Sequence, residues 1–366
     1  MVVTSPKQHS NGVETTSNSP ALEINCSQQF VGWLYQEQIS LAFTTYQTSR
    51  LILLGIGQEG RFSGFERNFN RAMGLYTVGS ERLMLSTKYQ LWQFDNVLEE
   101  GQNYQGYDKL YVPRTGYTTG DLDIHDVAVE DGGRIVFVST LLNCLATVSE
   151  SNSCTPLWKP SFISKVVNED RCHLNGMAMV DGKPRYVTAV AQTDVKDAWR
   201  EKRRNGGCVI DVTNNEIILS GLSMPHSPRF YQGKLWLMNS GTGEFGYVDL
   251  ERGSFEVVAF CPGYLRGLAF WKQWAIIGLS KPRGEDKTFS GLALDERLTE
   301  KGEEARCGLM VVDIKSSEIV HSVSVSGVIR ELYDVQILPQ VRRPMALGFQ
   351  NDEISTLLTL DSMGEL

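Results

Sequence analysis

The sequence lacks any apolar run near the roughly 20 residues that a membrane-spanning helix needs. It also lacks an apolar stretch close to its start. Met1 to Pro20 is rich in Ser, Thr, Asn and Gln, which predicts a disordered tail and no secretory signal. Basic residues are not in excess, because 35 Lys and Arg stand against 43 Asp and Glu, for a net charge of −8. This balance argues against nucleic acid or an anionic membrane as the main partner.

Cysteines are few and scattered, seven in all, and none stand in Cys-x-x-Cys spacing. A disulfide framework or a structural zinc site is therefore not indicated, and we expect reduced, buried thiols in a cytoplasmic protein. The sequence also has no nucleotide-binding fingerprint and no haem motif, so redox chemistry is disfavoured.

What the sequence does have is a repeated four-strand pattern, most complete from Ser223 to Phe260. Four short runs rich in β-branched and aromatic residues are separated there by glycine-containing turns, which is typical of one propeller blade. The first run of the pattern recurs six times along the chain. The predicted inner strands begin at Met73, His125, Asn175, His226, Arg266 and Tyr333.

The two ends of the chain are predicted to share one blade. The run at Tyr333 has no further strands after it, whereas Ile39 to Gln47 reads as a second strand with no inner strand before it. Pairing the two closes the ring and removes free sheet edges. The sequence therefore predicts an all-β, six-bladed β-propeller over residues 27–348, a disordered tail at 1–26 and a C-terminal tail at 349–366.

Two smaller features qualify this pattern. Residues 27–38 are predicted to form a short helix that packs outside the ring through Phe30, Leu34 and Trp33. Most of the long connections, among them 192–206 and 281–306, are expected to emerge on one face of the disc because strands alternate in direction, and residues 96–109 are the main exception. Loops elaborated on one face of a rigid scaffold are where binding residues usually lie.

Polar residues gather on that face, where the inner strands begin. Three of the five histidines of the chain fall there, on three consecutive blades, and Asp126 stands beside the first. Their roles are open at this point. The three imidazoles either hydrogen-bond to backbone and channel water, or transfer protons, or bind a divalent metal ion. The predicted catalytic residues are His125, His173, His226 and Asp126, and the predicted metal ligands are His125, His173, His226 and Asp334.

Two interpretations are open for the arginines near the ring. They either pair with Asp and Glu at the rim or face inward, where a guanidinium suits a carboxylate or phosphate. The run that begins at Trp199, Trp-Arg-Glu-Lys-Arg-Arg, is either a solvated loop or a contact for a peptide or an anion. The predicted substrate-binding residues are Arg71, Asn175, Arg229, Arg266, Tyr333 and Glu331.

Several phrases of the sequence resemble a bacterial family of conserved hypothetical proteins of unknown function. The resemblance runs from about Phe30 to Gly348 and implies no established activity. It is carried by phrases such as Glu-Asp-Arg-Cys-His-Leu-Asn-Gly from Glu169, Ser-Met-Pro-His-Ser-Pro-Arg from Ser223 and Pro-Gly-Tyr-Leu-Arg-Gly-Leu from Pro262.

A more distant resemblance is to the gluconolactonase, paraoxonase and strictosidine synthase-like six-bladed propellers, through the run from His173 to Val187. That resemblance implies a divalent cation held at the channel mouth by Asn, Asp and Glu. Asn175 and Asp334 stand at comparable positions, whereas His226 and Arg266 stand where oxygen ligands are expected.

Taken together, the sequence favours an enzyme that acts on a small polar or anionic substrate at the channel mouth, by hydrolysis or lyase-type chemistry. The alternative is a non-catalytic propeller that binds a peptide or a partner protein on the loop-rich face.

Overall fold

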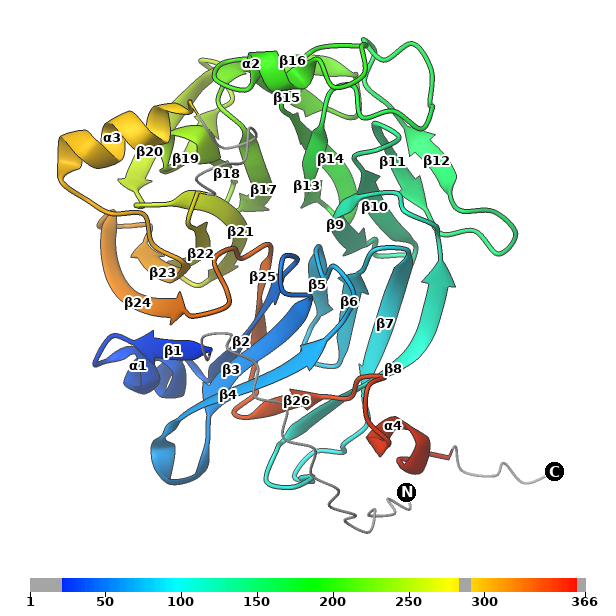
Figure 1. Ribbon diagram of the computed structural model, residues 1–366, viewed down its shortest axis with the longest axis vertical. Helices are drawn as coiled ribbons and strands as arrows, with labels where there is room; N and C mark the ends of the chain where they lie inside the picture. The colour runs from blue at the N-terminus through cyan, green and yellow to red at the C-terminus, as the bar shows by residue number, and fades with distance from the viewer. Residues whose placement is uncertain (1–21, 283–290, 361–366) are drawn as a thin grey trace.

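The strands form a ring of six four-stranded antiparallel sheets around a central channel (Figure 1). The computed structural model describes residues 22–282 and 291–360. The predicted six-bladed β-propeller is confirmed. We number the blades 1 to 6 by the order of their inner strands around the ring, with blade 1 containing β25.

The two inner layers of the ring consist of the first and second strand of each blade. The inner strands of blades 1 to 6 are β25 (Val335–Pro339), β5 (Leu75–Val78), β9 (Ile124–Val129), β13 (Leu174–Val180), β17 (Pro225–Tyr231) and β21 (Tyr264–Trp271). The second strands are β2 (Ile39–Thr45), β6 (Arg82–Ser86), β10 (Ile135–Ser139), β14 (Lys183–Ala189), β18 (Lys234–Asn239) and β22 (Trp274–Ser280).

The two outer layers complete each blade. The third strands are β3 (Arg50–Ile56), β7 (Gln90–Asn96), β11 (Cys144–Thr147), β15 (Gly207–Asp211), β19 (Glu244–Asp249) and β23 (Gly308–Asp313). The fourth strands are β4 (Phe62–Asn68), β8 (Lys109–Thr118), β12 (Thr155–Trp158), β16 (Glu216–Leu222), β20 (Ser254–Phe260) and β24 (Glu318–Ser326).

Blade 1 joins the two ends of the chain, as predicted. Its order is β25-β2-β3-β4, and Ile39 to Phe43 of β2 pairs antiparallel with Val335 to Pro339 of β25. The inner side chains of this junction, Leu41, Val335 and Leu338, are fully buried. The ring is therefore sealed by backbone hydrogen bonds and by a shared apolar core.

Two short strands outside the predicted pattern cover outer edges. β1 (Glu23–Cys26) pairs antiparallel with β24 of blade 6, and β26 (Pro344–Ala346) pairs parallel with β8 of blade 2. The prediction of a disordered tail over 1–26 is thus wrong for residues 23–26, because the open edge of β24 offers them backbone hydrogen-bond partners. Residues 1–21 lie outside the described residues.

The helices are additions to the ring of strands. α1 (Phe30–Glu37) buries Phe30, Trp33 and Leu34, the side predicted from the sequence, and ends where Gln38 adopts a left-handed conformation. The other helices are α2 (Trp199–Lys202), α3 (Ala293–Lys301) and α4 (Glu353–Thr356), with short 3₁₀ turns at η1 (Gln58–Gly60) and η2 (Ser240–Thr242). Within the described ranges, no helix is both long and apolar enough to cross a membrane.

Hydroxyl groups tie neighbouring blades together at five of the six junctions. In each case a Ser or Thr at or just after the end of a second strand donates a hydrogen bond to a carbonyl at or just before the start of the next blade's inner strand. At the sixth junction, between blades 4 and 5, Val190 takes the equivalent place. The five bonds are Thr44 to Met73 (2.5 Å), Ser86 to Ile124 (3.0 Å), Thr140 to Leu174 (2.6 Å), Ser240 to Leu265 (2.7 Å) and Ser280 to Leu332 (3.1 Å).

Removing β25 tests whether closure holds the ring together. We expect a chain that ends at residue 330 to lose its cooperative thermal unfolding transition, because β2 then exposes an unpaired edge and an apolar face. A chain that ends at residue 348 is the control and keeps the transition, since it retains β25 and β26. Circular dichroism during heating measures both, and native-like melting of the shorter chain would contradict the closure argument.

Candidate functional site

Each inner strand carries the same four-residue unit around its start. The second residue of the unit is apolar in every blade and packs between blades, while the third and fourth line the channel. We call the third residues the channel ring and the fourth residues the waist ring. Around blades 1 to 6, the channel ring is Tyr333, Met73, His125, Asn175, His226 and Arg266, and the waist ring is Asp334, Gly74, Asp126, Gly176, Ser227 and Gly267.

The waist ring alternates a hydrogen-bonding side chain with a glycine. Asp334 accepts a hydrogen bond from the backbone N–H of Leu75 at 2.9 Å, and Asp126 accepts one from that of Met177 at 3.0 Å. Ser227 accepts one from the backbone N–H of Gly267 at 3.1 Å. A Cβ atom at Gly267, where φ is +82°, would lie 2.8 Å from the Cα of Asp334. Glycine is therefore needed where the inner strands approach most closely.

Arg229 crosses the channel below these rings and joins two carboxylates. Its Nη1 donates to Oδ2 of Asp126 at 2.8 Å and to the carbonyls of Met177 and Pro228, and its Nη2 lies 3.7 Å from Oδ1 of Asp334. Burial raises the pKa of Asp334 to about 7, although the Arg229 charge acts in the opposite direction. Asp126 is fully engaged by backbone N–H groups and Arg229, so the predicted catalytic role of Asp126 and the predicted substrate-binding role of Arg229 give way to a structural one.

His226 is held through both ring nitrogens. Its Nδ1 lies 2.8 Å from the carbonyl oxygen of Met224, so Nδ1 carries the proton, and Nε2 then accepts from the amide of Asn175 at 2.9 Å. Burial, followed by the nearby Arg266 charge, lowers the pKa of His226 well below its usual value. His226 and Asn175 therefore form a neutral pair in the channel wall.

His125 stands on the opposite side of Asn175 in the ring. Its Nδ1 donates to the carbonyl of Asp123 at 3.0 Å, which leaves the lone pair on Nε2. Burial lowers the pKa of His125 to about 4, despite the opposing effect of Asp123. The imidazole is thus neutral near pH 7 and packs edge-on against the rings of His173 (5.0 Å) and Tyr333 (5.6 Å).

His173 differs from the other two because a carboxylate orients it. Its Nδ1 donates to Oδ2 of Asp170 at 2.7 Å, and Oδ1 of Asp170 accepts the backbone N–H of His173 at 3.0 Å. Burial opposes the charge of Asp170, but His173 holds the pKa of that carboxyl below its ordinary value. The ionised Asp170 therefore fixes the tautomer whose Nε2 is free to accept a proton.

The arginines at the mouth already have partners, which matches the first of the two readings from sequence. Arg71 pairs with Asp121 and lies 3.5 Å from Asp123. Arg171 pairs with Glu169 and Asp194, each at 2.8 Å. Neither guanidinium is left for a substrate anion.

Arg266 lies in a cage of three tyrosine rings, with its guanidinium carbon 5.1 to 5.4 Å from their centroids. The three are Tyr46, Tyr264 and Tyr333. Burial opposes the charge of Arg266, but these tyrosines and Glu331 raise its pKa, so it stays protonated. Glu331 is 1% exposed and accepts a hydrogen bond from the Tyr46 hydroxyl at 2.5 Å. Arg266, Tyr333 and Glu331, all predicted to bind substrate, are thus packed into the wall.

The predicted metal set does not form a metal centre. Within residues 22–282 and 291–360, no three His, Cys, Asp or Glu side chains are grouped so as to hold a metal ion. The carboxylate of Asp334 is occupied by two backbone N–H groups, and Nε2 of His226 by Asn175. His125, His173, His226 and Asp334 therefore do not fit a divalent cation, and we derive no chemistry from one.

A small cavity separates the imidazoles from Arg229. Its volume is about 10 Å³, which is room for about one water molecule. Polar groups line it on all sides, as a buried water requires. The lining residues are His125, Asp126, Asn175, Gly176, His226, Ser227, Arg229, Tyr333 and Asp334.

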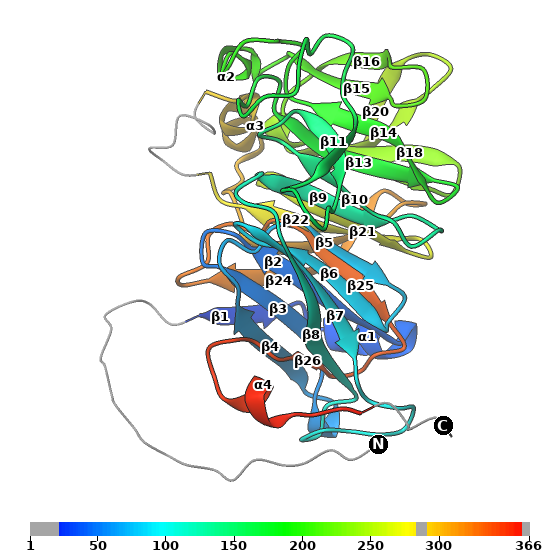
Figure 2. The same ribbon diagram turned by 90° about the vertical axis from the view of Figure 1, so that its right-hand side faces the viewer.

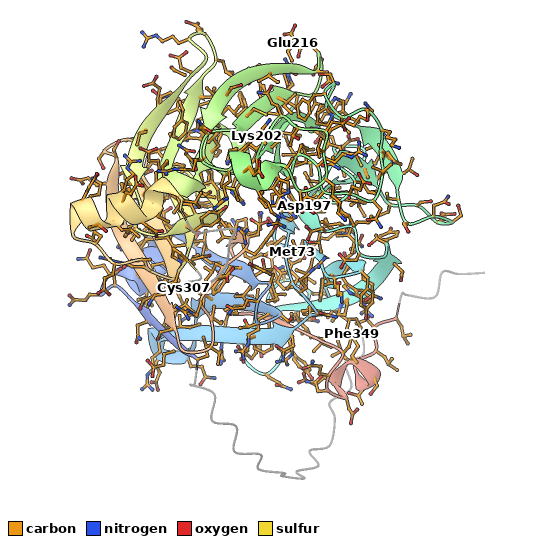
Figure 3. The ribbon with its side chains drawn as sticks, turned by 45° about the horizontal axis from the view of Figure 1, so that its top comes forward. Met73, Asp197, Lys202, Glu216, Cys307 and Phe349 are labelled. Atoms are coloured by element: carbon orange, nitrogen blue, oxygen red, sulfur yellow. The ribbon has the colours of Figure 1, made fainter. Side chains whose placement is uncertain are left out.

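Two residues that matter at the mouth escaped the sequence analysis. Asp170 precedes His173 by three residues, and that spacing was the only local signal of the pair. A solvated loop was one of the two interpretations of the run that begins at Trp199, but Trp199 is 1% exposed and stacks on His173 with 4.1 Å between ring centroids. That interpretation is wrong for Trp199, because the strongly charged residues around it concealed a single buried side chain. Met73, labelled near the centre of Figure 3, marks the channel ring beside them.

Comparison with known proteins identifies a family and a fold. A family model described as "Domain of unknown function (DUF4915)" matches residues 28–347. No curated protein matches the sequence. Among solved structures, a nidogen/laminin complex aligns with a TM-score of 0.50 and 10% identity, covering 82% of this chain and 99% of that one.

Two further solved structures align over similar lengths. A protein of unknown function from Bacteroides caccae has a TM-score of 0.47 at 10% identity, with 82% and 98% of the two chains covered. A virginiamycin B lyase from Staphylococcus aureus has a TM-score of 0.38 at 8% identity, with 83% and 99% covered. Identities this low carry no information about activity.

Replacing Arg229 tests its role beneath the channel ring. We expect Arg229→Met to lower the free energy of unfolding by about 3–5 kcal/mol at pH 8, because two buried carboxylates lose their shared cation. The loss should shrink at pH 5. There, Asp334 binds a proton in both folded proteins, because its pKa is about 7 even beside Arg229, so the variant leaves only Asp126 without its cation.

Urea unfolding at the two pH values measures this difference. Arg185→Met is the matched control, since Arg185 pairs with Asp211 but its side chain is 42% exposed, and its loss should cost at most about 1 kcal/mol. Equal, small effects of the two substitutions would show that Arg229 does not hold the channel together.

Proposed function

Since the chain belongs to the DUF4915 family, whose description assigns no activity, we propose from the channel geometry that it is an enzyme acting on a small polar substrate at the channel mouth. The observation that carries this proposal is the Asp170–His173 pair. A carboxylate on Nδ1 and a lone pair on Nε2 is the arrangement that makes a histidine a general base.

The reaction class follows from what surrounds the base. His125 and Trp199 are its ring neighbours, and no serine or cysteine is hydrogen-bonded to either ring nitrogen of His173 among the described residues. His173 would therefore act on a water molecule or on an acidic C–H of the substrate, which corresponds to hydrolysis or to lyase-type elimination.

The substrate class follows from the charges. The sequence admitted an anionic substrate, but the guanidiniums of Arg71, Arg171 and Arg266 are each matched by carboxylates or tyrosines. An anion would have to displace one of these partners and bear the cost of leaving it unpaired. A neutral polar substrate, such as a small cyclic or linear ester, carries no such cost.

A second candidate function is the binding of an acidic peptide on the same face without catalysis. The segment that carries α2 presents Arg200 and Arg204 with side chains 47% and 54% exposed, on a protein of net charge −8. Binding of this kind would weaken with salt, because exposed charges are screened.

Hydrolysis of uncharged lactones and short acyl esters, followed with a pH indicator, tests the leading proposal. We expect His173→Gln to lower kcat by about 10²–10⁴-fold, because the general base is lost. Asp170→Asn should lower kcat as well, since an amide does not fix the required tautomer.

The control for this assay is His321→Gln, because His321 lies on β24 and packs against Phe30 and Trp33, away from the channel. It should retain the wild-type rate. Identical rates for wild type and His173→Gln across the panel, together with salt-sensitive binding of a hexaglutamate peptide, would favour the second candidate.

A further inference from the structure

Two long insertions meet above the mouth of the channel. One is residues 192–206, between β14 and β15, and the other is residues 291–306, which contain α3 and precede β23. We call these two segments the cap. α2 and α3 lie on the same face of the disc (Figure 2). Arg204 of the first segment and Glu296 of the second form an ion pair at 3.1 Å.

Trp199 is the residue through which the cap reaches the channel. Its indole packs among Leu292, Leu294 and Leu298 of the second segment, and among channel-side residues that include Val190 and Tyr264. Leu294 and Leu298 stand one helical turn apart on α3, so the helix presents one apolar stripe to the indole. Asp197 and Lys202, labelled in Figure 3, mark the stretch that carries Trp199.

The indole covers one face of the candidate base. It stacks on the imidazole of His173 at 4.1 Å with an interplanar angle of 28°, and Arg200 covers the indole at 4.3 Å. His173 is left 8% exposed. The buried Nε1 of Trp199 has no hydrogen-bond partner among the described residues. A buried donor without a partner lowers stability, so this packing is less favourable than its apolar contacts alone suggest.

The position of the cap is tied to the residues that orient the base. The backbone carbonyl of Asp170 accepts the N–H of Asp197 at 2.8 Å, while the side chain of Asp170 holds His173. Next to it, Arg171 binds Asp194 at 2.8 Å, and Asp194 also accepts the backbone N–H of Ser164. On the cap side both anchors are polar groups of half-exposed or exposed residues, Asp194 and Asp197, and such contacts open more readily than an apolar core.

We propose that Trp199 is a specificity-determining residue that controls access to His173. In the closed cap the indole excludes any group larger than a water molecule from the imidazole. Substrate reaches the base when the first cap segment moves outward and carries the indole with it. The space that the indole leaves when it moves is no larger than the indole itself, so only small polar molecules fit beside His173. The role of His173 as the base rests on the proposed function, whereas the covering of His173 by Trp199 does not.

Chemical labelling of His173 tests this access control without a substrate. Diethyl pyrocarbonate acylates unprotonated imidazoles that it can reach, and mass spectrometry of the resulting peptides reports the rate at each histidine. We expect Trp199→Ala to raise the labelling rate of His173 by about tenfold, which corresponds to about 1.4 kcal/mol of lost closing free energy. Trp199→Phe keeps a stacked ring and should raise the rate by less than about threefold.

A second variant guards against misfolding of Trp199→Ala. Asp194→Ala removes a half-exposed anchor of the cap but does not change Trp199 itself. It should therefore fold normally and raise the labelling of His173 to a level between wild type and Trp199→Ala. Trp236→Phe, in the core of blade 5, is the control and should leave His173 labelling unchanged.

The outcomes separate this inference from the proposed function. Equal labelling of His173 in wild type, Trp199→Ala and Asp194→Ala would overturn the access role of Trp199, even if His173→Gln abolishes hydrolysis. Increased labelling in a protein that hydrolyses nothing in the panel would uphold the access role and remove the catalytic one. Increased labelling together with faster hydrolysis of bulkier esters by Trp199→Ala supports both.

Discussion

The hydrogen bonds at the waist ring are the constraint on which the rest of the structure depends. Six inner strands converge there. Every other blade contributes a side chain that accepts a hydrogen bond from a backbone N–H of the next blade. The intervening glycines permit the approach, and Arg229 links the two carboxylates across the axis. Because buried polar groups need partners, this arrangement commits the most polar part of the channel to holding blades together. Polarity at a propeller hub is therefore a poor guide to chemistry on its own.

That commitment explains why one histidine stands out among three. Two residues of the channel ring are committed in this way, because His226 is hydrogen-bonded to Asn175 of the neighbouring blade and Arg266 is enclosed by tyrosines. His173 immediately precedes its inner strand, β13, and takes its partner, Asp170, from its own loop. A side chain oriented by local contacts can change protonation without loosening the joints between blades. The proposed base is thus placed where catalysis and stability would conflict least.

The sequence predicted what depends on local pattern and missed what depends on distant partners. Alternating strands, glycine turns and the orphaned run at Tyr333 were enough to predict six blades and their closure. The role of Asp126 was not predictable, because Met177 and Arg229 come from other blades, 51 and 103 residues away. The short strand β1 depends in the same way on an edge formed almost 300 residues later. The burial of Trp199 was not predicted, because its charged neighbours dominate the mean hydropathy of the segment.

The junction between blades 4 and 5 connects these observations. It is the one junction of the ring where Val190 replaces the hydroxyl that binds the next blade elsewhere, and Val190 packs in the same cluster as Trp199. An apolar contact there gives the cap a surface to pack on, which a hydrogen-bonded Ser or Thr would not provide. This junction lacks the hydroxyl bond, but it is joined by the hydrogen bond between Asn175 and His226 and by that from Arg229 to the carbonyl of Met177. A site that must admit a ligand gains from such a place, because the cap can move on an apolar surface while the hydrogen bonds between the blades beneath it stay intact.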